Sequence, residues 1–128
     1  MATRKPTKTR ALPDAQLRPG QIPMALQRLD ALIQEVAAFD TSMLTKRYSD
    51  EQEALSVRIA YEIAAIFGDT VQGKRFGNAQ KLDYPLIQFP LAGSVAEIRQ
   101  DVENAKGKSL EILQEAVAWV QRQSASRP

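Results

Sequence analysis

The amino-acid sequence predicts an all-α protein, a small helical bundle of three long helices and one short helix with an apolar irregular loop. Three observations support this. Apolar residues recur at steps of three and four over long stretches. Two serines are each followed three positions later by Gln or Glu, a pattern typical of helix starts. Aromatic residues make up only 6% of the chain, so the core must come mainly from Leu, Ile, Val and Ala, and both Leu and Ala favour helices.

The first long helix is expected over residues 23–46. Pro23 suits the first position of a helix, because the amide hydrogen that proline lacks has no partner there. The apolar residues keep helical spacing far along this range: Ala25, Leu26, Leu29, Leu32, Ile33, Val36, Phe39, Met43 and Leu44. A bend or break near Asp40, Thr41 and Ser42 is left open, since such side chains compete for backbone hydrogen bonds.

The second long helix is expected over residues 50–67. Ser49 and Gln52 form a capping-box pattern at its start, and Gly68 suits the left-handed residue that ends many helices. The apolar positions on the face expected to point inward are Leu55, Ile59, Ile63, Ile66 and Phe67. Val57 and Tyr61 form a second apolar edge. This edge predicts contact on two sides, either with another helix of the chain or with a partner.

A short helix is expected over residues 70–76, followed by a loop over 78–93. The loop has no helical period, contains Pro85 and Pro90, and is apolar. Long connections without regular structure are uncommon in compact domains. We expect the loop to pack across the helices as an irregular lid, with a binding surface as the alternative.

The last helix is expected over residues 95–122. Ser94 and Glu97 form its capping box, and apolar residues keep the three/four spacing from there to Trp119, which we expect to pack in the core. Gly107 interrupts this pattern but leaves its phase intact. We therefore expect one long helix, with a bend near Gly107 left open.

The chain is expected to form one domain. Its 128 residues are 44% hydrophobic and 25% charged, which is ordinary for a globular protein. Residues 21–123 are assigned to the helical domain, residues 124–128 to a frayed tail and residues 1–20 to a flexible basic arm. Five basic residues and one acidic residue give residues 1–20 a charge of +4, which leaves −2 for the rest of a chain whose net charge is +2.

Cysteine and histidine are both absent from the sequence. Disulfides are therefore impossible, the usual ligands of zinc, haem and iron–sulfur clusters are missing, and Ser-His-Asp or Cys-His catalysis has no base. We expect no enzymatic activity, no cofactor and no metal. The sequence has no run of about 18 apolar residues and no apolar stretch after its first basic residues, so we expect neither a membrane span nor a secretory signal, but a cytoplasmic protein.

Residues 68–74 match the G-x-x-x-x-G-K opening of a phosphate-binding loop. The match fails at Arg75, where Ser or Thr would hold magnesium. It also fails in context, because the loop should follow a buried strand and this one follows an expected helix. We therefore do not expect a nucleotide site here.

Two stretches, 58–76 and 105–121, resemble a loosely defined group of uncharacterised bacterial all-α accessory modules, some of them associated with antiphage effector systems. The shared features are Phe67-Gly68, Thr70, Phe76 and Ile112-Leu113, and the likeness, from residue 58 to residue 121, covers about half the chain. The aromatic that usually stands between the Ser/Thr and the final Phe is missing. The resemblance implies a helical accessory or interaction domain. Related helical ribonucleases need a histidine, so that activity is not carried over.

We expect a non-catalytic protein-interaction or oligomerisation module, an accessory subunit of a bacterial defence or regulatory complex, with a homodimer or another protein as partner. The candidate interface residues are Val57, Tyr61, Tyr84, Leu86, Ile87, Phe89, Val117 and Val120. The alternative is a small nucleic-acid-associated protein that uses its basic arm. The residues for this alternative are Arg4, Lys5, Lys8, Arg10, Lys74 and Arg75.

Overall fold

The computed structural model describes residues 11–45, 49–82 and 94–125. All regular elements of these residues are helical, which confirms the all-α fold. The α-helices are α1 (Ile22–Ala37), α2 (Asp50–Phe67), α3 (Val71–Phe76) and α4 (Val95–Ala125), and the short 3-10 helices are η1 (Pro19–Gln21), η2 (Thr41–Met43) and η3 (Gly77–Gln80).

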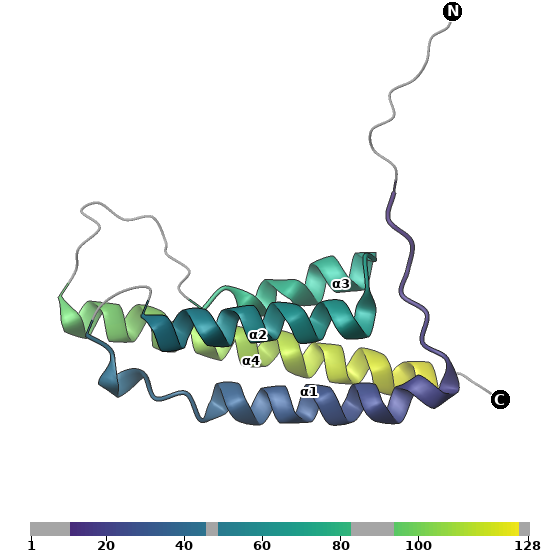
Figure 1. Ribbon diagram of the computed structural model, residues 1–128, viewed down its shortest axis with the longest axis horizontal. Coiled ribbons are helices and arrows are strands. Elements are labelled where there is room, and N and C mark those ends of the chain that lie inside the picture. Colours follow the sequence, from purple (N-terminus) through teal and green to yellow (C-terminus); the bar gives the residue numbers. More distant parts are fainter. Residues whose placement is uncertain (1–10, 46–48, 83–93, 126–128) are drawn as a thin grey trace, which may run out of the picture.

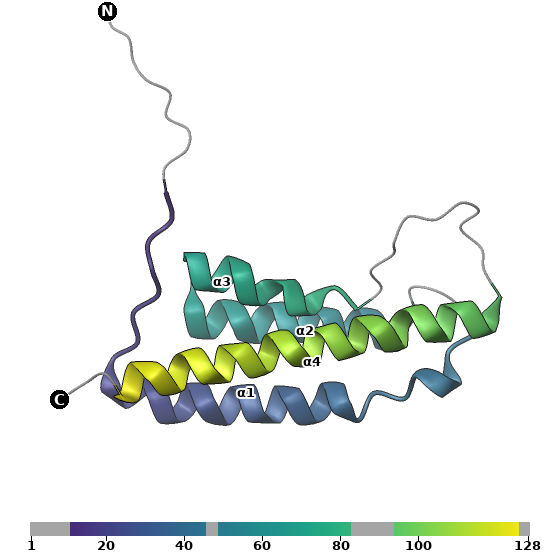
Figure 2. The same cartoon turned by 180° about the vertical axis from the view of Figure 1, so that it is seen from behind.

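The helices form an up-and-down bundle in which each leg runs antiparallel to the next (Figure 1). The long helix α4 packs along α1 on one side and against η3 on the other. The third leg of the bundle consists of α3 followed by η3, and it also packs against α2. Helix α2 packs in turn against α1. The order around the bundle is therefore α1, α4, α3–η3 and α2. Seen from behind, α4 runs the whole length of the bundle (Figure 2).

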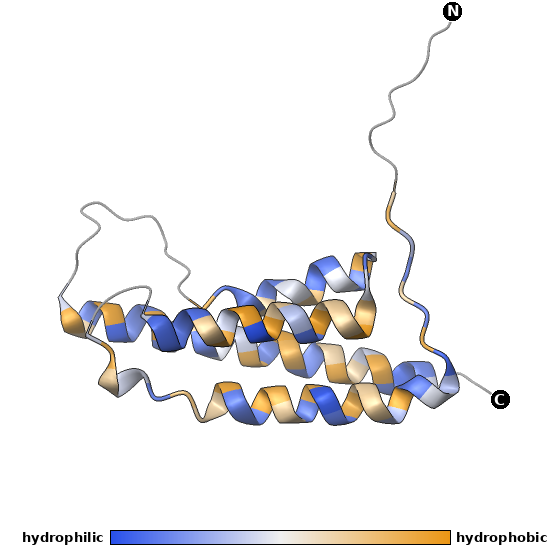
Figure 3. Cartoon of the chain, in the orientation of Figure 1, coloured by the Kyte–Doolittle hydropathy of each residue, from blue (hydrophilic) through white to orange (hydrophobic). Residues whose placement is uncertain are grey.

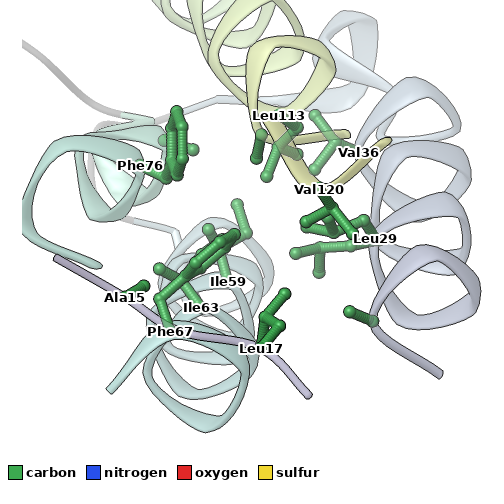
Figure 4. Packing of buried hydrophobic residues seen from close by; sticks show 14 of the residues in the cluster. Ala15, Leu17, Leu29, Val36, Ile59, Ile63, Phe67, Phe76, Leu113 and Val120 are labelled. Carbon is green, nitrogen blue, oxygen red and sulfur yellow. The ribbon is translucent and has the colours of Figure 1, made fainter. Parts of the chain in front are cut away.

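The main core lies where these four legs face one another (Figure 4). Its centre is aromatic: the Phe67 ring lies 5.1 Å from that of Phe76 and 5.7 Å, edge on, from that of Trp119. Trp119 is partly buried and packs against the core, on the side that its spacing predicts. The fully buried side chains around this centre include Leu29, Leu32, Val36, Ile59, Ile63, Leu82, Leu113 and Val120.

Helix α1 is shorter than the expected 23–46, because it ends at Ala37. Asp40 adopts an extended backbone (φ −95°, ψ 102°), and its carboxylate accepts hydrogen bonds from the Ser42 amide (3.0 Å) and hydroxyl (2.6 Å). These bonds cap the separate turn η2 and lower the pKa of Asp40. The apolar period nevertheless continues, because the chain returns Leu44 to a buried position after the break.

Helix α2 has the expected bounds. The Ser49 hydroxyl accepts from the Gln52 amide (3.2 Å), and Gly68 ends the helix at φ +67°. Only half of the expected capping box forms. The side-chain amide of Gln52 is fully buried and has no hydrogen-bond partner in the described part of the chain.

Thr70 joins α2 to α3. Its hydroxyl donates to the Phe67 carbonyl (2.9 Å) and accepts from the Gly73 amide (3.0 Å). A Cβ atom on Gly73 would lie 2.2 Å from the Gly68 carbonyl oxygen, so only glycine allows this close return. The amides of residues 70, 71, 73 and 74 are all used in bonds within the chain. Residues 68–74 follow helix α2 and lead into α3, which is the helical context that the sequence predicts for them.

Helix α4 runs unbroken through Gly107 and extends to Ala125, into the predicted tail. Both bonds of its capping box form: the Ser94 amide donates to Glu97 Oε1 (2.9 Å) and the Glu97 amide to Ser94 Oγ (3.0 Å). Its first half packs against η2 and the residue after it, Leu44. The buried side chains there, Leu44, Ile98, Val102 and Ala105, lie apart from the main core, and polar side chains also join α4 to this part of the chain. Arg99 donates to the Leu44 carbonyl and Lys106 to the Phe39 carbonyl, each at 2.9 Å.

The prediction that residues 1–20 form a flexible arm is wrong for the second half of this range. Residues 11–18 run across the end of the bundle, beside the start of α3 (Figure 1). The Val71 amide donates to the Pro13 carbonyl (3.0 Å), and the Ala15 amide donates to Gln72 Oε1 (2.7 Å). Ala15 and Leu17 are buried in the core (Figure 4). The two buried apolar side chains, Ala15 and Leu17, therefore hold this segment to the bundle.

Candidate interaction surface

Helix α2 carries two apolar faces, and only one of them is buried. Leu55, Ile59 and Ile63 point into the core, whereas Val57 and Tyr61 are 62% and 66% exposed. After a hydrophilic first turn, hydrophobic residues occur along the rest of the helix (Figure 3). The exposed face is the candidate functional surface of this chain.

The position of the exposed face follows from helix geometry. Successive residues are about 100° apart, so a residue two positions after a core residue lies on nearly the opposite side of the helix. Val57 and Tyr61 stand two positions after Leu55 and Ile59. Exposed small residues continue the same side at steps of three and four, and we define the outer stripe of α2 as Ala54, Val57, Tyr61, Ala65 and Gly68.

Charged residues separate the outer stripe from α1. Arg58 lies 3.4 Å from Glu35 of α1 and 3.9 Å from Glu62, and Arg28 of α1 lies 3.6 Å from Glu62. These four side chains join the two helices across their shared edge. Since the pairs are partly exposed, we expect each to add little stability. Their position means that the outer stripe is bounded on one side by a charged border.

The two ends of the outer stripe differ in charge. At the start of α2, three acidic residues occupy the first turn: Asp50, Glu51 and Glu53. At the other end the chain turns into α3, which carries Lys74 and Arg75 in its last turn. Arg75 is paired with Glu115 of α4 (3.1 Å) and lies over the Phe76 ring. Lys74 is exposed and makes no ion pair within the described residues.

The other residues predicted for an interface have mixed positions. Val120 is fully buried in the chain's own core, so it is removed from the candidate surface, and Val117 is half-buried against that core. The remaining predicted interface residues, Tyr84, Leu86, Ile87 and Phe89, lie outside the described residues. The structure therefore leaves Val57 and Tyr61 as the exposed pair among the predicted residues that it describes.

The nucleic-acid alternative depends largely on residues outside the described part of the chain: Arg4, Lys5, Lys8 and Arg10. Of its two other residues, Arg75 is held by Glu115, which leaves Lys74 as a single unpaired cation on α3 within the described residues. This alternative stays a prediction.

The sequence interpretation missed the small residues of the outer stripe. Ala54 and Ala65 stand three positions before Val57 and four after Tyr61, and this spacing was available as a signal. It went unused because alanine by itself gives no preference for a buried or an exposed position on a helix.

Other kinds of site find no support in the described residues. They hold no group of three or more acidic side chains placed to bind a metal ion. No helix among them has the length and apolar character needed to cross a membrane. Comparisons of the chain with protein families, with curated proteins and with solved structures found no match.

Proposed function

We propose that this chain is a non-catalytic interaction module that pairs with a second copy of itself through the outer stripe of α2. The observation that carries the proposal is the exposed Val57–Tyr61 pair, which continues in small residues along the helix. A helix with apolar residues on opposite sides gains stability when both are covered, and the chain covers only the inner side in its described part.

The spacing of the outer stripe is self-complementary. In an antiparallel pair of α2 helices with a two-fold axis at Tyr61, each Val57 faces Ala65 of the second copy and each Ala54 faces its Gly68. Large residues then meet small ones along the contact, which is how helix surfaces interlock. A two-fold axis places the same surface on both copies, as in most homodimers.

The charges of α2 also favour an antiparallel pair. A parallel pair would bring together the two acidic first turns, which contain Asp50, Glu51 and Glu53, and like charges repel. The antiparallel pair separates these turns and places each beside the carboxyl end of the other α2. Lys74 lies close to that end in the sequence and has no ion pair among the described residues.

The expected strength of the pair follows from its size. Stable protein interfaces bury about 800 Å² on each partner, and a single helix stripe offers less. We therefore expect a reversible dimer that forms at micromolar concentrations. An accessory role in a bacterial defence or regulatory complex, which the resemblance of residues 58–76 and 105–121 implies, belongs to the same proposal, because such subunits act by binding other proteins.

Sedimentation equilibrium over a concentration series tests the proposal. The wild-type chain should change from its monomer mass of 14.2 kDa toward twice that value, and Tyr61→Lys should remain a monomer. Met24→Lys is the matched control, because Met24 is an apolar residue of similar exposure (58%) on α1, outside the stripe.

The control should behave as the wild type does. A wild-type chain that stays monomeric at every concentration would contradict the proposal. So would a dimer that survives Tyr61→Lys with unchanged affinity.

A further inference from the structure

A pocket of about 330 Å³ lies between η3 and α4, away from the outer stripe of α2. Ala105 and Ile112 of α4 supply its apolar wall. Lys81, directly after η3, and Lys108 of α4 are the two cations among the described lining residues. Small-ligand sites typically occupy pockets of about 300–1,000 Å³ that are mostly apolar and carry a few polar groups.

The pocket is fixed by a buried hydrogen bond. The Ser109 hydroxyl, on α4, donates to the Ala79 carbonyl of η3 (2.8 Å), and both residues are buried. This bond holds the end of the third leg against α4. Ala105, Lys108 and Ile112 share one face of the helix because they are three and four positions apart. The walls are therefore built from elements that the core already positions.

The hydrogen bonds between described residues leave mainly donors free around the pocket. Asn104 Oδ1 accepts from Gln100 Nε2 (2.9 Å), which leaves the Asn104 amide hydrogens for a ligand. Lys81 and Lys108 make no ion pair within the described residues. Asn78 donates to the Arg75 carbonyl (3.2 Å) and keeps its own carbonyl oxygen.

The charge of the lining residues also favours a ligand that accepts hydrogen bonds. Among the described lining residues, Asp101 is the one acidic side chain, it already has an interaction elsewhere, and the two lysines outnumber it. A ligand that matches this lining must bring acceptor atoms and negative charge.

We propose that this pocket binds a small organic anion with a one- or two-ring apolar body. The carboxylate or sulfonate contacts Lys81, Lys108 and the Asn104 amide, and the rings cover Ala105 and Ile112. The α2 stripe contributes nothing to this pocket. The ligand site and the dimer are therefore independent, and either can fail without the other.

A pair of fluorescent probes tests the charge requirement on the full chain. 8-Anilinonaphthalene-1-sulfonate and N-phenyl-1-naphthylamine share the same rings, but only the first carries a sulfonate. The anionic probe should bind with one site per chain and the neutral probe at least about tenfold more weakly, which is the effect of two partly exposed charge-assisted contacts. Amide NMR shifts should change at Lys81, Ala105 and Lys108.

Two variants complete the test. The double variant Lys81→Gln/Lys108→Gln should weaken the anionic probe about tenfold, and Arg122→Gln, at an exposed cation of α4 outside the pocket, should leave it unchanged. An unchanged thermal midpoint of the double variant shows that its fold is intact.

Equal binding of the two probes would overturn the proposal, as would a double variant that binds like the wild type. Shift changes confined to α2 would also overturn it, because they would place the dye on the outer stripe.

Discussion

Both sides of α2 carry apolar residues, the inner side more of them, but the two sides have different environments. On the inner side, Ile59, Ile63 and Phe67 are almost completely buried by the other legs of the bundle. On the outer side, Val57 and Tyr61 stay exposed. The difference shows that periodicity identifies an apolar face without identifying the chain that covers it. We propose that the inner side stabilises the monomer and the outer side joins two monomers.

The largest effect should come from Phe67→Ala on the inner side. Phe67 is buried between Phe76 and Trp119, so its removal leaves a cavity, and we expect a loss of about 3–5 kcal/mol in the free energy of unfolding. Urea unfolding followed by the fluorescence of Trp119, the single tryptophan of the chain, measures this. A loss below about 1 kcal/mol would mean that the aromatic centre does not hold the bundle together.

The next effect concerns the turn that folds α3 back on the end of α2. Gly73→Ala should cost about 1–3 kcal/mol, because the new Cβ would collide with the Gly68 carbonyl oxygen. Gly107→Ala is the matched control: this glycine is also helical, but none of the described residues outside its own helix backbone places an atom within 4 Å of its added Cβ. That change should stabilise the protein by about 0.5–1 kcal/mol. Thermal unfolding of the two variants should therefore shift in opposite directions, and a shift in the same direction would contradict the geometry.

Gln52 is the polar exception on the inner side of α2. Its side-chain amide is buried without a partner in the described residues, and such a group costs about 1–3 kcal/mol. Gln52→Leu keeps the backbone amide that Ser49 caps and removes the unpaired atoms, so we expect a gain of about 1–2 kcal/mol in denaturant unfolding. A clear loss of stability would show that the amide does have a partner.

The smallest effect on stability should come from the outer side. Tyr61→Lys replaces an exposed side chain, so the free energy of unfolding of the monomer should change by no more than about 0.5 kcal/mol, measured at concentrations below dimer formation. The loss in the free energy of unfolding should therefore be much smaller for Tyr61→Lys than for Phe67→Ala, on the opposite side of the same helix. A large loss at Tyr61 would place this residue in the monomer core instead.

Much of the fold could be predicted from local signals. The Ser94–Glu97 pair and Gly68 mark helix ends through contacts within a few residues, and these contacts form as expected. Ala116 is buried and Ile112 and Trp119 pack partly buried against the core, as the spacing of the last helix predicts, whereas the fully buried line of this helix runs through Leu113, Ala116 and Val120.

The predictions that failed depend on tertiary contacts. Spacing alone could not show that the chain breaks after Ala37, because Leu44 resumes the apolar period once η2 has turned the chain. Ala15 and Leu17 lie in a proline-containing polar stretch without helical spacing, so their docking beside α3 left no periodic signal. Spacing also made both Val120 and Tyr61 interface candidates, although Val120 is buried and Tyr61 is exposed. Only the tertiary structure separates the two.

Disulfide cross-linking tests the antiparallel pairing of α2 most directly, because the natural chain contains no cysteine. The variants Val57→Cys and Ala65→Cys are mixed, one of them carrying an affinity tag so that mixed and like dimers differ in mass, and then oxidised. The antiparallel two-fold pair predicts that the mixed dimer dominates, since positions 57 and 65 face each other. No cross-linking, or dimers linked only between like positions, would contradict the account.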